Sequence, residues 1–235
     1  MARQSQPTVL LTRPLAQSQR FARDIGGALI SPLMQPKFLT PAWPAGDFAA
    51  VIFTSETGVE AARRISVSGM ALPTRAFCVG DRTAAAARSA GFDANSAAGS
   101  VKDLSAYIQR AESSGTMLIL RAQDSAGNLA EDLFSAGIET VSVVAYKQQS
   151  LPLSTEAVDL LRAEEPVIVP VFSPRSAKLL TAELSRIKAK APIWLAALSG
   201  AISEAFEFPT QRKLVAVRPD GVSMRDLIGV MRGFA

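Results

Sequence analysis

The stretch Val51-Ile52-Phe53-Thr54-Ser55 decides the fold, because the chain repeats its pattern at Val167-Ile168-Val169-Pro170-Val171-Phe172-Ser173. Each stretch is typical of a short buried strand that ends at a serine, and a helical pattern follows each of them, at 56–64 and 174–184. In both copies a second strand then leads to the start of a second helix. The chain therefore carries the same α/β module twice.

The two copies also share their spacing. Gly80 lies 25 residues after Ser55, and Ser199 lies 26 residues after Ser173. Strands that alternate with helices favour parallel sheets with right-handed crossovers. Two copies predict two similar lobes with a cleft between them, toward which helix N-termini with free backbone N–H groups point.

The rest of the chain continues the alternation, so we predict an α/β fold of two similar three-layer α/β/α lobes with parallel sheets. Short apolar runs predict the further strands, and amphipathic runs of about ten residues predict the helices. We expect a small-residue loop at 92–99 and a turn at 121–126. The predicted strands are 9–11, 28–33, 76–80, 117–120, 141–146, 193–198 and 213–217, and the helices are 15–25, 81–90, 100–112, 127–136, 154–163, 201–206 and 222–231.

Two proline-bearing stretches without periodicity, about 35–46 and 147–152, predict the points where the chain crosses between lobes. One domain would then be continuous and inserted, at 38–146. The other would be discontinuous, built from 1–34 plus 153–235. A simpler division into halves is also possible, but it would leave the second copy without its opening strands.

Composition sets limits on the class of protein. Hydrophobic residues make up 48% of the chain and charged residues 20%, which is typical of a globular protein. No apolar run is long enough for a membrane span, and residues 1–6 contain no apolar signal region, so we expect a cytoplasmic protein. The single cysteine, Cys78, lies in an apolar strand and is expected to be buried in a reducing compartment.

The chain contains no histidine, which excludes Ser-His-Asp, Cys-His and imidazole acid–base chemistry. One cysteine and no histidine do not favour a zinc site. The sequence also has neither G-x-G-x-x-G nor a Walker phosphate loop. We therefore expect no metal and no cofactor.

The net charge is +4, from 25 basic and 21 acidic residues that are scattered along the chain. Without a concentrated basic stripe we expect no nucleic-acid partner. An excess of arginine suits a small molecule with several carboxylates, because the guanidinium fork matches a carboxylate. A solvated surface explains the same excess equally well.

Candidate binding residues lie at the strand-to-helix turns, which share one edge in an open α/β sheet. Each turn offers backbone N–H groups, a hydroxyl or an arginine. Ordinary helix capping is the alternative for any single serine or threonine. The candidates for substrate binding are Arg13, Thr54, Ser55, Gly80, Thr83, Arg121, Ser173, Ser199 and Gly200.

Tyr146, one of two tyrosines, ends a predicted strand next to a crossing. A phenol at this place could donate a proton to a leaving hydroxyl. The alternative is a boundary tyrosine with a buried ring and a wet hydroxyl.

An ordered set of short motifs across nearly the whole chain resembles the uroporphyrinogen-III synthase family. Each motif is weak alone, and the ordered set is fairly specific. The motifs are V-L-L-T-R-P at 9–14, V-I-F-T-S at 51–55, C-V-G-D-R-T-A at 78–84, S-V-K-D-L at 100–104, L-I-L-R at 118–121, V-V-A-Y at 143–146 and V-F-S-P at 171–174.

The resemblance implies two α/β lobes joined by a two-stranded linker, one lobe being discontinuous. It implies conversion of hydroxymethylbilane, a linear tetrapyrrole, to uroporphyrinogen III with inversion of ring D and loss of water, using no cofactor. Separately, we expect the chain to be a monomer. It also implies binding largely through backbone N–H groups and a role for the tyrosine in hydroxyl departure. The matching positions are Thr54, Ser55, Gly80, Thr83, Tyr146 and Ser173.

The chain departs from the family pattern at two positions. Ile202 stands where the second copy usually has threonine, and Thr57 stands where the first copy often has asparagine. Ser199 or Ser203 could replace the missing hydroxyl. A non-enzymatic two-lobed binding module for a small polyanionic ligand is the alternative function.

Overall fold

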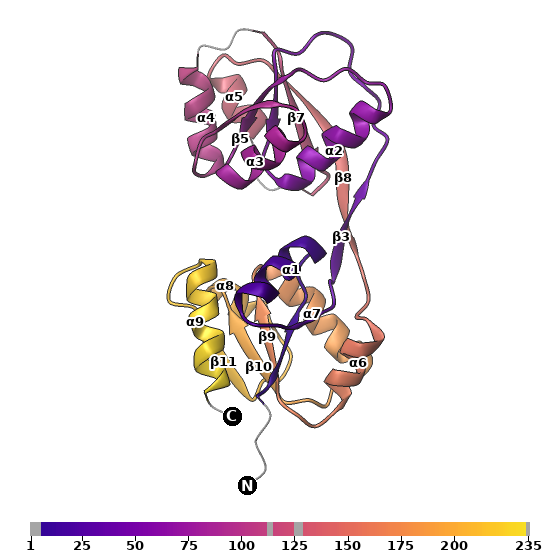
Figure 1. Cartoon of the computed structure of the whole chain (residues 1–235), viewed down its shortest axis with the longest axis vertical. Helices are drawn as coiled ribbons and strands as arrows, with labels where there is room; N and C mark the ends of the chain where they lie inside the picture. The colour runs from indigo at the N-terminus through magenta and orange to yellow at the C-terminus, as the bar shows by residue number, and fades with distance from the viewer. Residues whose placement is uncertain (1–5, 112–114, 125–128, 234–235) are drawn as a thin grey trace. The chain divides into compact units, whose positions relative to one another are not determined.

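The computed structural model describes residues 6–111, 115–124 and 129–233. The chain divides into two compact units, each with its own sheet. Unit 1 is Met1–Gln35 with Gln149–Ala235, and unit 2 is Pro36–Gln148. Unit 1 is therefore built from two segments that are distant in the sequence, and the chain passes between the units twice (Figure 1).

Unit 1 contains a five-stranded parallel sheet of order β11-β10-β9-β1-β2. Its central strands are runs of aliphatic residues buried on both faces, which is typical of parallel strands. The strands are β1 (Thr8–Leu11), β2 (Leu29–Ile30), β9 (Val167–Val171), β10 (Ile193–Ala197) and β11 (Arg212–Val215). The helices are α1 (Leu15–Asp24), α6 (Thr155–Arg162), α7 (Pro174–Ile187), α8 (Gly200–Glu204) and α9 (Gly221–Arg232).

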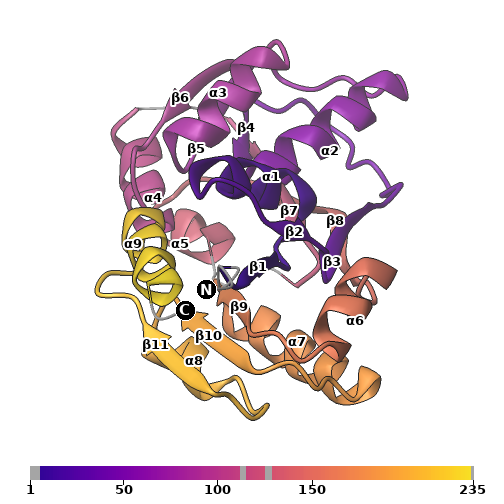
Figure 2. The same cartoon turned by 60° about the horizontal axis from the view of Figure 1, so that its bottom comes forward.

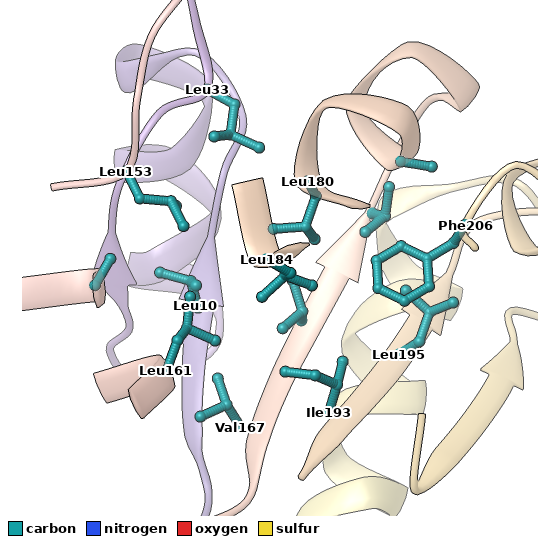
Figure 3. Packing of buried hydrophobic residues seen from close by; sticks show 14 of the residues in the cluster. Leu10, Leu33, Leu153, Leu161, Val167, Leu180, Leu184, Ile193, Leu195 and Phe206 are labelled. Carbon is teal, nitrogen blue, oxygen red and sulfur yellow. The ribbon is translucent and has the colours of Figure 1, made fainter. Parts of the chain in front are cut away.

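Helices cover both faces of this sheet. Successive side chains of a strand point to opposite faces, so an apolar strand contributes to a core on each side. Val167 packs in a core with Leu180 of α7, whereas its neighbour Ile168 packs in a second core with Met224 of α9. Figure 3 shows the first core, in which side chains of β1, β9 and β10 meet those of α6 and α7. Figure 2 shows α7 and α8 on one side of β9 and β10, and α9 on the other.

Unit 2 contains a six-stranded sheet of order β3-β8-β7-β4-β5-β6, in which β4 to β8 are parallel. Its two cores lie under α2 and α3 on one face and under α4 and α5 on the other. The strands are β3 (Met34–Phe38), β4 (Ala50–Phe53), β5 (Arg75–Cys78), β6 (Asp93–Ser96), β7 (Met117–Ala122) and β8 (Thr140–Ser150). The helices are α2 (Glu56–Val67), α3 (Asp81–Ser89), α4 (Val101–Arg110) and α5 (Leu129–Ser135).

The two sheets have one arrangement with different starting points. Unit 1 reads β2-β1-β9-β10-β11, and unit 2 without β3 reads β8-β7-β4-β5-β6. Unit 2 is a circular permutation of unit 1, because placing β7 and β8 before β4 in the chain gives both sheets the same strand sequence. The helices agree as well. On one face of the sheet, α7 and α8 share a core in unit 1, and α2 and α3 share the equivalent core in unit 2. On the other face, α9 and α1 share a core in unit 1, and α4 and α5 share the equivalent core in unit 2.

Backbone hydrogen bonds beyond the strand ends show the same equivalence. Val79 N–H donates to Phe53 O at 3.1 Å, and Leu198 N–H donates to Val171 O at 3.0 Å. The next strand repeats the match, since the N–H groups of Ala97 and Ala216 donate to the carbonyls at the ends of β5 and β10, both at 2.9 Å. The repeated module therefore occupies the same place in both sheets.

The α/β class with parallel sheets is confirmed, and most predicted elements are present with ends shifted by a few residues. One loop prediction is wrong: 92–99 contains β6. Its sequence Asp93-Ala94-Asn95-Ser96 has weak strand propensity, and pairing with β5 imposes the extended conformation. The predicted helix start at 100 is confirmed, with a capping box between Ser100 and Asp103.

The first crossing was predicted as an aperiodic linker, but part of it forms β3. Leu39 N–H donates to Ala145 O and Leu151 N–H donates to Leu33 O, both at 2.9 Å, so β3 runs antiparallel to β8. Pro36 fits there because β3 is an edge strand. The same pairing extends β8 past Tyr146 to Ser150, beyond the strand 141–146 that the residue pattern predicts. The paired β3 and β8 agree with the two-stranded linker that the family resemblance implied.

Some predictions fall partly outside the described residues: the N-terminal segment 1–5, the end of the helix to 112, the end of the turn at 121–126 and the start of the helix at 127. Residues 121 and 122, expected in that turn, belong to β7 instead. Within the ranges that the structure describes, no helix is both long and apolar enough to cross a membrane.

Candidate functional site

Both copies of the repeated module end their first strand at a serine that caps the next helix. Ser55 has φ −158° and ψ 158°, and its hydroxyl accepts a hydrogen bond from Gly58 N–H at 3.3 Å. Ser173 has φ −153° and ψ 152°, and its hydroxyl accepts from Ser176 N–H at 3.1 Å. The capping interpretation therefore holds for both hydroxyls, which are also candidate binding groups.

Gly80 and Ser199 occupy the second equivalent position. They are the N-cap residues that precede α3 and α8, with φ −151° and −155°, and neither makes a side-chain cap hydrogen bond. Because this backbone is extended, it does not require glycine, and a Cβ at Gly80 would meet no atom within 4 Å. This explains why a serine stands at the same place in unit 1.

Tyr146 contacts the first of these serines. The hydroxyl oxygens of Tyr146 and Ser55 lie 3.0 Å apart, and either can be the donor. Tyr146 is 5% exposed, and its ring packs near Phe38, with 6.3 Å between ring centroids. The alternative of a buried ring is thus correct, but the hydroxyl is bonded to a candidate binding residue.

The Ser55–Tyr146 pair can supply a proton. The two hydroxyls carry two hydrogens, and the bond between the oxygens uses one of them. Gly58 N–H donates its own hydrogen to the Ser55 hydroxyl, so this bond uses neither hydroxyl hydrogen. If Ser55 donates to Tyr146, the phenolic hydrogen is available for another acceptor at the carboxyl edge of the unit 2 sheet.

Thr54 and Arg121 come to neighbouring positions at the same edge. Ile52 is paired with Ile119, and continuing this parallel register by two residues places Thr54 beside Arg121. One guanidinium nitrogen of Arg121 donates to the carbonyl of Ala122 at 3.2 Å. The side chain is half-buried, so β7 restrains the guanidinium close to the strand end.

Thr83 differs from the other candidates because its side chain is buried, at 6% exposure, on the inner side of α3. Ile202 is its equivalent in unit 1, since both are the third residue of their helix. Ile202 is 4% exposed and belongs to the core around Leu180. A core position accepts isoleucine readily, which is a physical reason for the departure from the usual threonine.

In unit 1, Arg13 lies against the aromatic ring that precedes Ser173. Its Cζ is 4.0 Å from the ring centroid of Phe172, and Phe172 packs edge-on against Phe21 of α1. Ser173 also bonds the hydroxyl of Ser176 at 2.8 Å. Gly200 begins α8, which follows β10, the strand next to β9 in the sheet.

Each sheet thus gathers its own candidates. Unit 2 brings together Ser55 with Tyr146 and Thr54 with Arg121, and unit 1 brings Arg13 beside the strand that carries Ser173. The sequence prediction missed Phe38 and Phe172, the rings next to Tyr146 and Arg13. Phe172 directly precedes a capping serine, but no sequence signal shows which arginine a strand-end ring faces.

The described residues do not form a cluster of metal ligands. Over 6–111, 115–124 and 129–233, no three acidic, cysteine or histidine side chains gather as metal ligands. Burial in the core of unit 2 raises the pKa of the Cys78 thiol to about 11. This thiol is therefore protonated at neutral pH and is a poor nucleophile.

Comparisons with known proteins agree on one family. The family model for uroporphyrinogen-III synthase HemD matches residues 18–225. The uroporphyrinogen-III synthetase structure from Helicobacter pylori is 15% identical, with a TM-score of 0.67, over 96% of this chain and 99% of that one. A mutant uroporphyrinogen III synthase from Thermus thermophilus is 14% identical, with a TM-score of 0.50, over 97% and 100%. No curated protein matches the sequence. At these identities the solved structures support the fold, and the family model supports the family.

Proposed function

The chain belongs to the uroporphyrinogen-III synthase family, and we infer that its sheet edges serve that family's reaction. The chain cyclises hydroxymethylbilane to uroporphyrinogen III, with inversion of ring D and loss of water. The family match gives no support to a non-enzymatic binding module. What we propose is how the residues described above carry out the reaction.

The protein directs closure mainly by orientation. Hydroxymethylbilane loses its hydroxyl readily and closes without inversion when left alone, so the enzyme has to favour one closure over another. A hundredfold preference corresponds to about 2.7 kcal/mol of barrier difference. A few hydrogen bonds to the substrate carboxylates that are stronger in one transition state can supply this amount. Backbone N–H groups at the strand-to-helix turns donate these hydrogen bonds. The residues that supply them are Thr54, Ser55, Gly80, Ser173, Ser199 and Gly200.

Tyr146 acts as the acid for hydroxyl departure. Its phenolic proton passes to the hydroxyl oxygen of the substrate, the bond between that oxygen and the methylene carbon breaks, and water leaves. The resulting carbocation is stabilised by its pyrrole ring, and the phenolate is stabilised by the hydroxyl of Ser55, 3.0 Å away. A capping hydroxyl at the N-terminus of a 12-residue helix is well placed for this, because the helix dipole also favours negative charge there.

The Ser55–Tyr146 pair is the observation that supports this mechanism best. The test is to generate hydroxymethylbilane in the presence of the protein and to separate the uroporphyrin isomers by chromatography after oxidation. We expect isomer III in large excess, while a sample without the protein gives isomer I. A product that is entirely isomer I would overturn the proposed function.

The remaining features follow from the same proposal. The family implies a small tetrapyrrole substrate. We propose in addition a cytoplasmic monomer without a nucleic-acid partner, with units 1 and 2 as the discontinuous domain and the inserted domain. The scattered charge supports the absence of a nucleic-acid partner, and the separate cores of the two units support the division into two domains. Light scattering after gel filtration measures the mass against 24.9 kDa for one chain.

A further inference from the structure

The circular permutation identifies an equivalent pair among the arginines. Ser55 and Ser173 are equivalent capping residues, so Thr54 is equivalent to Phe172. In unit 2 the register of β4 and β7 places Arg121 beside Thr54. In unit 1 the register of β1 and β9 pairs Val9 with Ile168, and its continuation places Arg13 beside Phe172.

A side-chain contact supports the continuation of the β1–β9 register from Val9 to Arg13. The guanidinium carbon of Arg13 lies 4.0 Å from the centroid of the Phe172 ring, so the two side chains are neighbours as the register requires. Sheet faces agree too: Arg13 alternates with Val9 and Leu11 on the face under α1 and α9, and Arg121 alternates with Ile119 on the equivalent face. Arg13 and Arg121 therefore hold the same place in their units.

This place is the switch point of each sheet. At a switch point, the connections from two adjacent strands run in opposite directions along the sheet. These strands are β1 and β9 in unit 1, and β7 and β4 in unit 2. Ligands of open α/β sheets bind outside the carboxyl ends of such strands. Both arginines lie at those ends, and both are half-buried, which strengthens an ion pair relative to bulk water.

The surroundings restrain each guanidinium. Arg13 is restrained by the contact of its guanidinium with the Phe172 ring. Arg121 is held by a hydrogen bond to the carbonyl of Ala122. A restrained, planar guanidinium is suited to bidentate binding of a carboxylate.

We propose that Arg13 and Arg121 are matched carboxylate anchors, one in each unit, and that each binds a pyrrole carrying acetate and propionate groups. The proposal rests on the proposed function and adds to it: the two units recognise the same chemical unit of the substrate in the same way. Each anchor belongs to one unit, so it operates whatever the arrangement of the units.

The test uses porphobilinogen, a single pyrrole with one acetate and one propionate, as the probe. Titration of the full chain, followed by calorimetry or by NMR of the probe, is expected to show two sites per chain. Arg13→Gln and Arg121→Gln are each expected to weaken one site roughly tenfold or more and to leave the other unchanged. The double variant is expected to lose both.

Two further arginines provide matched controls. Arg186 on α7 and Arg63 on α2 are exposed and paired with Glu183 and Glu60 on their own helices. Arg186→Gln and Arg63→Gln remove the same charge from the same units and are expected to keep both sites. If a glutamine variant fails to fold, Arg13→Lys or Arg121→Lys is measured instead; it keeps the charge but loses the fork, so its site is expected to weaken.

The outcomes separate this proposal from the proposed function. Two intact sites in both glutamine variants, or no site in the unmodified chain, would overturn the anchors even if isomer III is formed. If the control variants weakened porphobilinogen binding equally, the effect would come from general charge, and this result would also overturn the two anchors. Two specific sites in a chain that yields isomer I alone would support the anchors and overturn the function.

Discussion

The hydroxyl oxygens of Ser55 and Tyr146 lie 3.0 Å apart, although 91 positions of the chain separate the two residues. Ser55 follows β4 and Tyr146 lies on β8, with β7 between these strands in the sheet. The contact therefore connects a helix cap with the strand through which the chain leaves unit 2. Both oxygens lie at the carboxyl edge, where the proposed chemistry takes place.

Tyr146→Phe is expected to lower turnover by about a hundredfold and largely to keep the isomer ratio. Loss of general acid catalysis typically costs this much, whereas orientation depends on other groups. The measurement is the rate of bilane consumption together with the isomer composition. Tyr107→Phe, which changes the other tyrosine on α4, is the control and is expected to retain the full rate. Full activity in Tyr146→Phe would rule out the acid role.

Ser55→Ala is expected to reduce the free energy of unfolding by about 1 kcal/mol, because a cap is lost. Its effect should also be coupled to Tyr146→Phe by roughly 0.5–1.5 kcal/mol in a double-mutant cycle. Urea unfolding followed by the fluorescence of Trp43 in unit 2, in a Trp194→Phe background, gives these energies. Ser173→Ala removes the equivalent cap in unit 1 and should show no coupling to Tyr146. Strict additivity of Ser55→Ala and Tyr146→Phe would contradict the hydrogen bond.

Ile202→Thr restores the usual family residue, yet we expect it to destabilise the protein by about 1–2 kcal/mol without raising turnover. Ile202 is buried in the apolar core of unit 1, where a hydroxyl needs a partner. Urea unfolding and the bilane assay measure the two effects. The reciprocal Thr83→Val variant tests the equivalent place in unit 2, and we expect it to fold and to retain activity. A clear gain of activity in Ile202→Thr would show that the hydroxyl is needed.

Stability is expected to fall in acid partly through Glu183. Its carboxylate accepts from Arg186 and from Leu153 N–H at the second crossing, and the hydrogen bond from Arg186 holds its pKa below the usual 4.5. A depressed pKa in the folded state stabilises the fold above about pH 4.5, and the contribution disappears as the pH falls through the folded pKa. Glu183→Gln should therefore be less stable than the unmodified chain at pH 7, by roughly 1–2 kcal/mol, and equal to it at low pH.

The control for Glu183 is Glu60→Gln on α2. Glu60 is paired with Arg63 and Arg64 at an exposed helix surface, so its loss should cost at most about 0.5 kcal/mol. Thermal unfolding of the three proteins between pH 3 and pH 7 measures the differences. A gap between Glu183→Gln and the unmodified chain that did not change with pH would contradict the role of the charge.

Cys78 is expected to be inert toward thiol reagents at pH 8 in the folded protein. The thiol is buried and its pKa is raised to about 11, so very little thiolate is present and reagents have no access. Labelling should therefore follow the unfolding of unit 2, and its rate should rise with urea in parallel with the loss of Trp43 signal. Rapid labelling without denaturant would contradict the burial of β5.

The sequence by itself determined the local structure. The strands around Val51–Phe53 and Val167–Val171 are continuous apolar runs, and the serines after them are strong caps, so both copies of the module were predictable. The capping box at Ser100 was predictable for the same reason, since its hydrogen bonds join residues three positions apart. Interactions of this short range depend little on the rest of the chain.

The tertiary structure decided what depends on pairing between distant segments. β6 is extended because it pairs with β5, and β3 is a strand because it pairs with β8, although neither segment has strong strand propensity. Register likewise places Arg121 beside Thr54 and Arg13 beside Phe172, and packing brings Tyr146 to Ser55. These contacts arise from long-range pairing, which residue patterns along a single sequence do not encode locally.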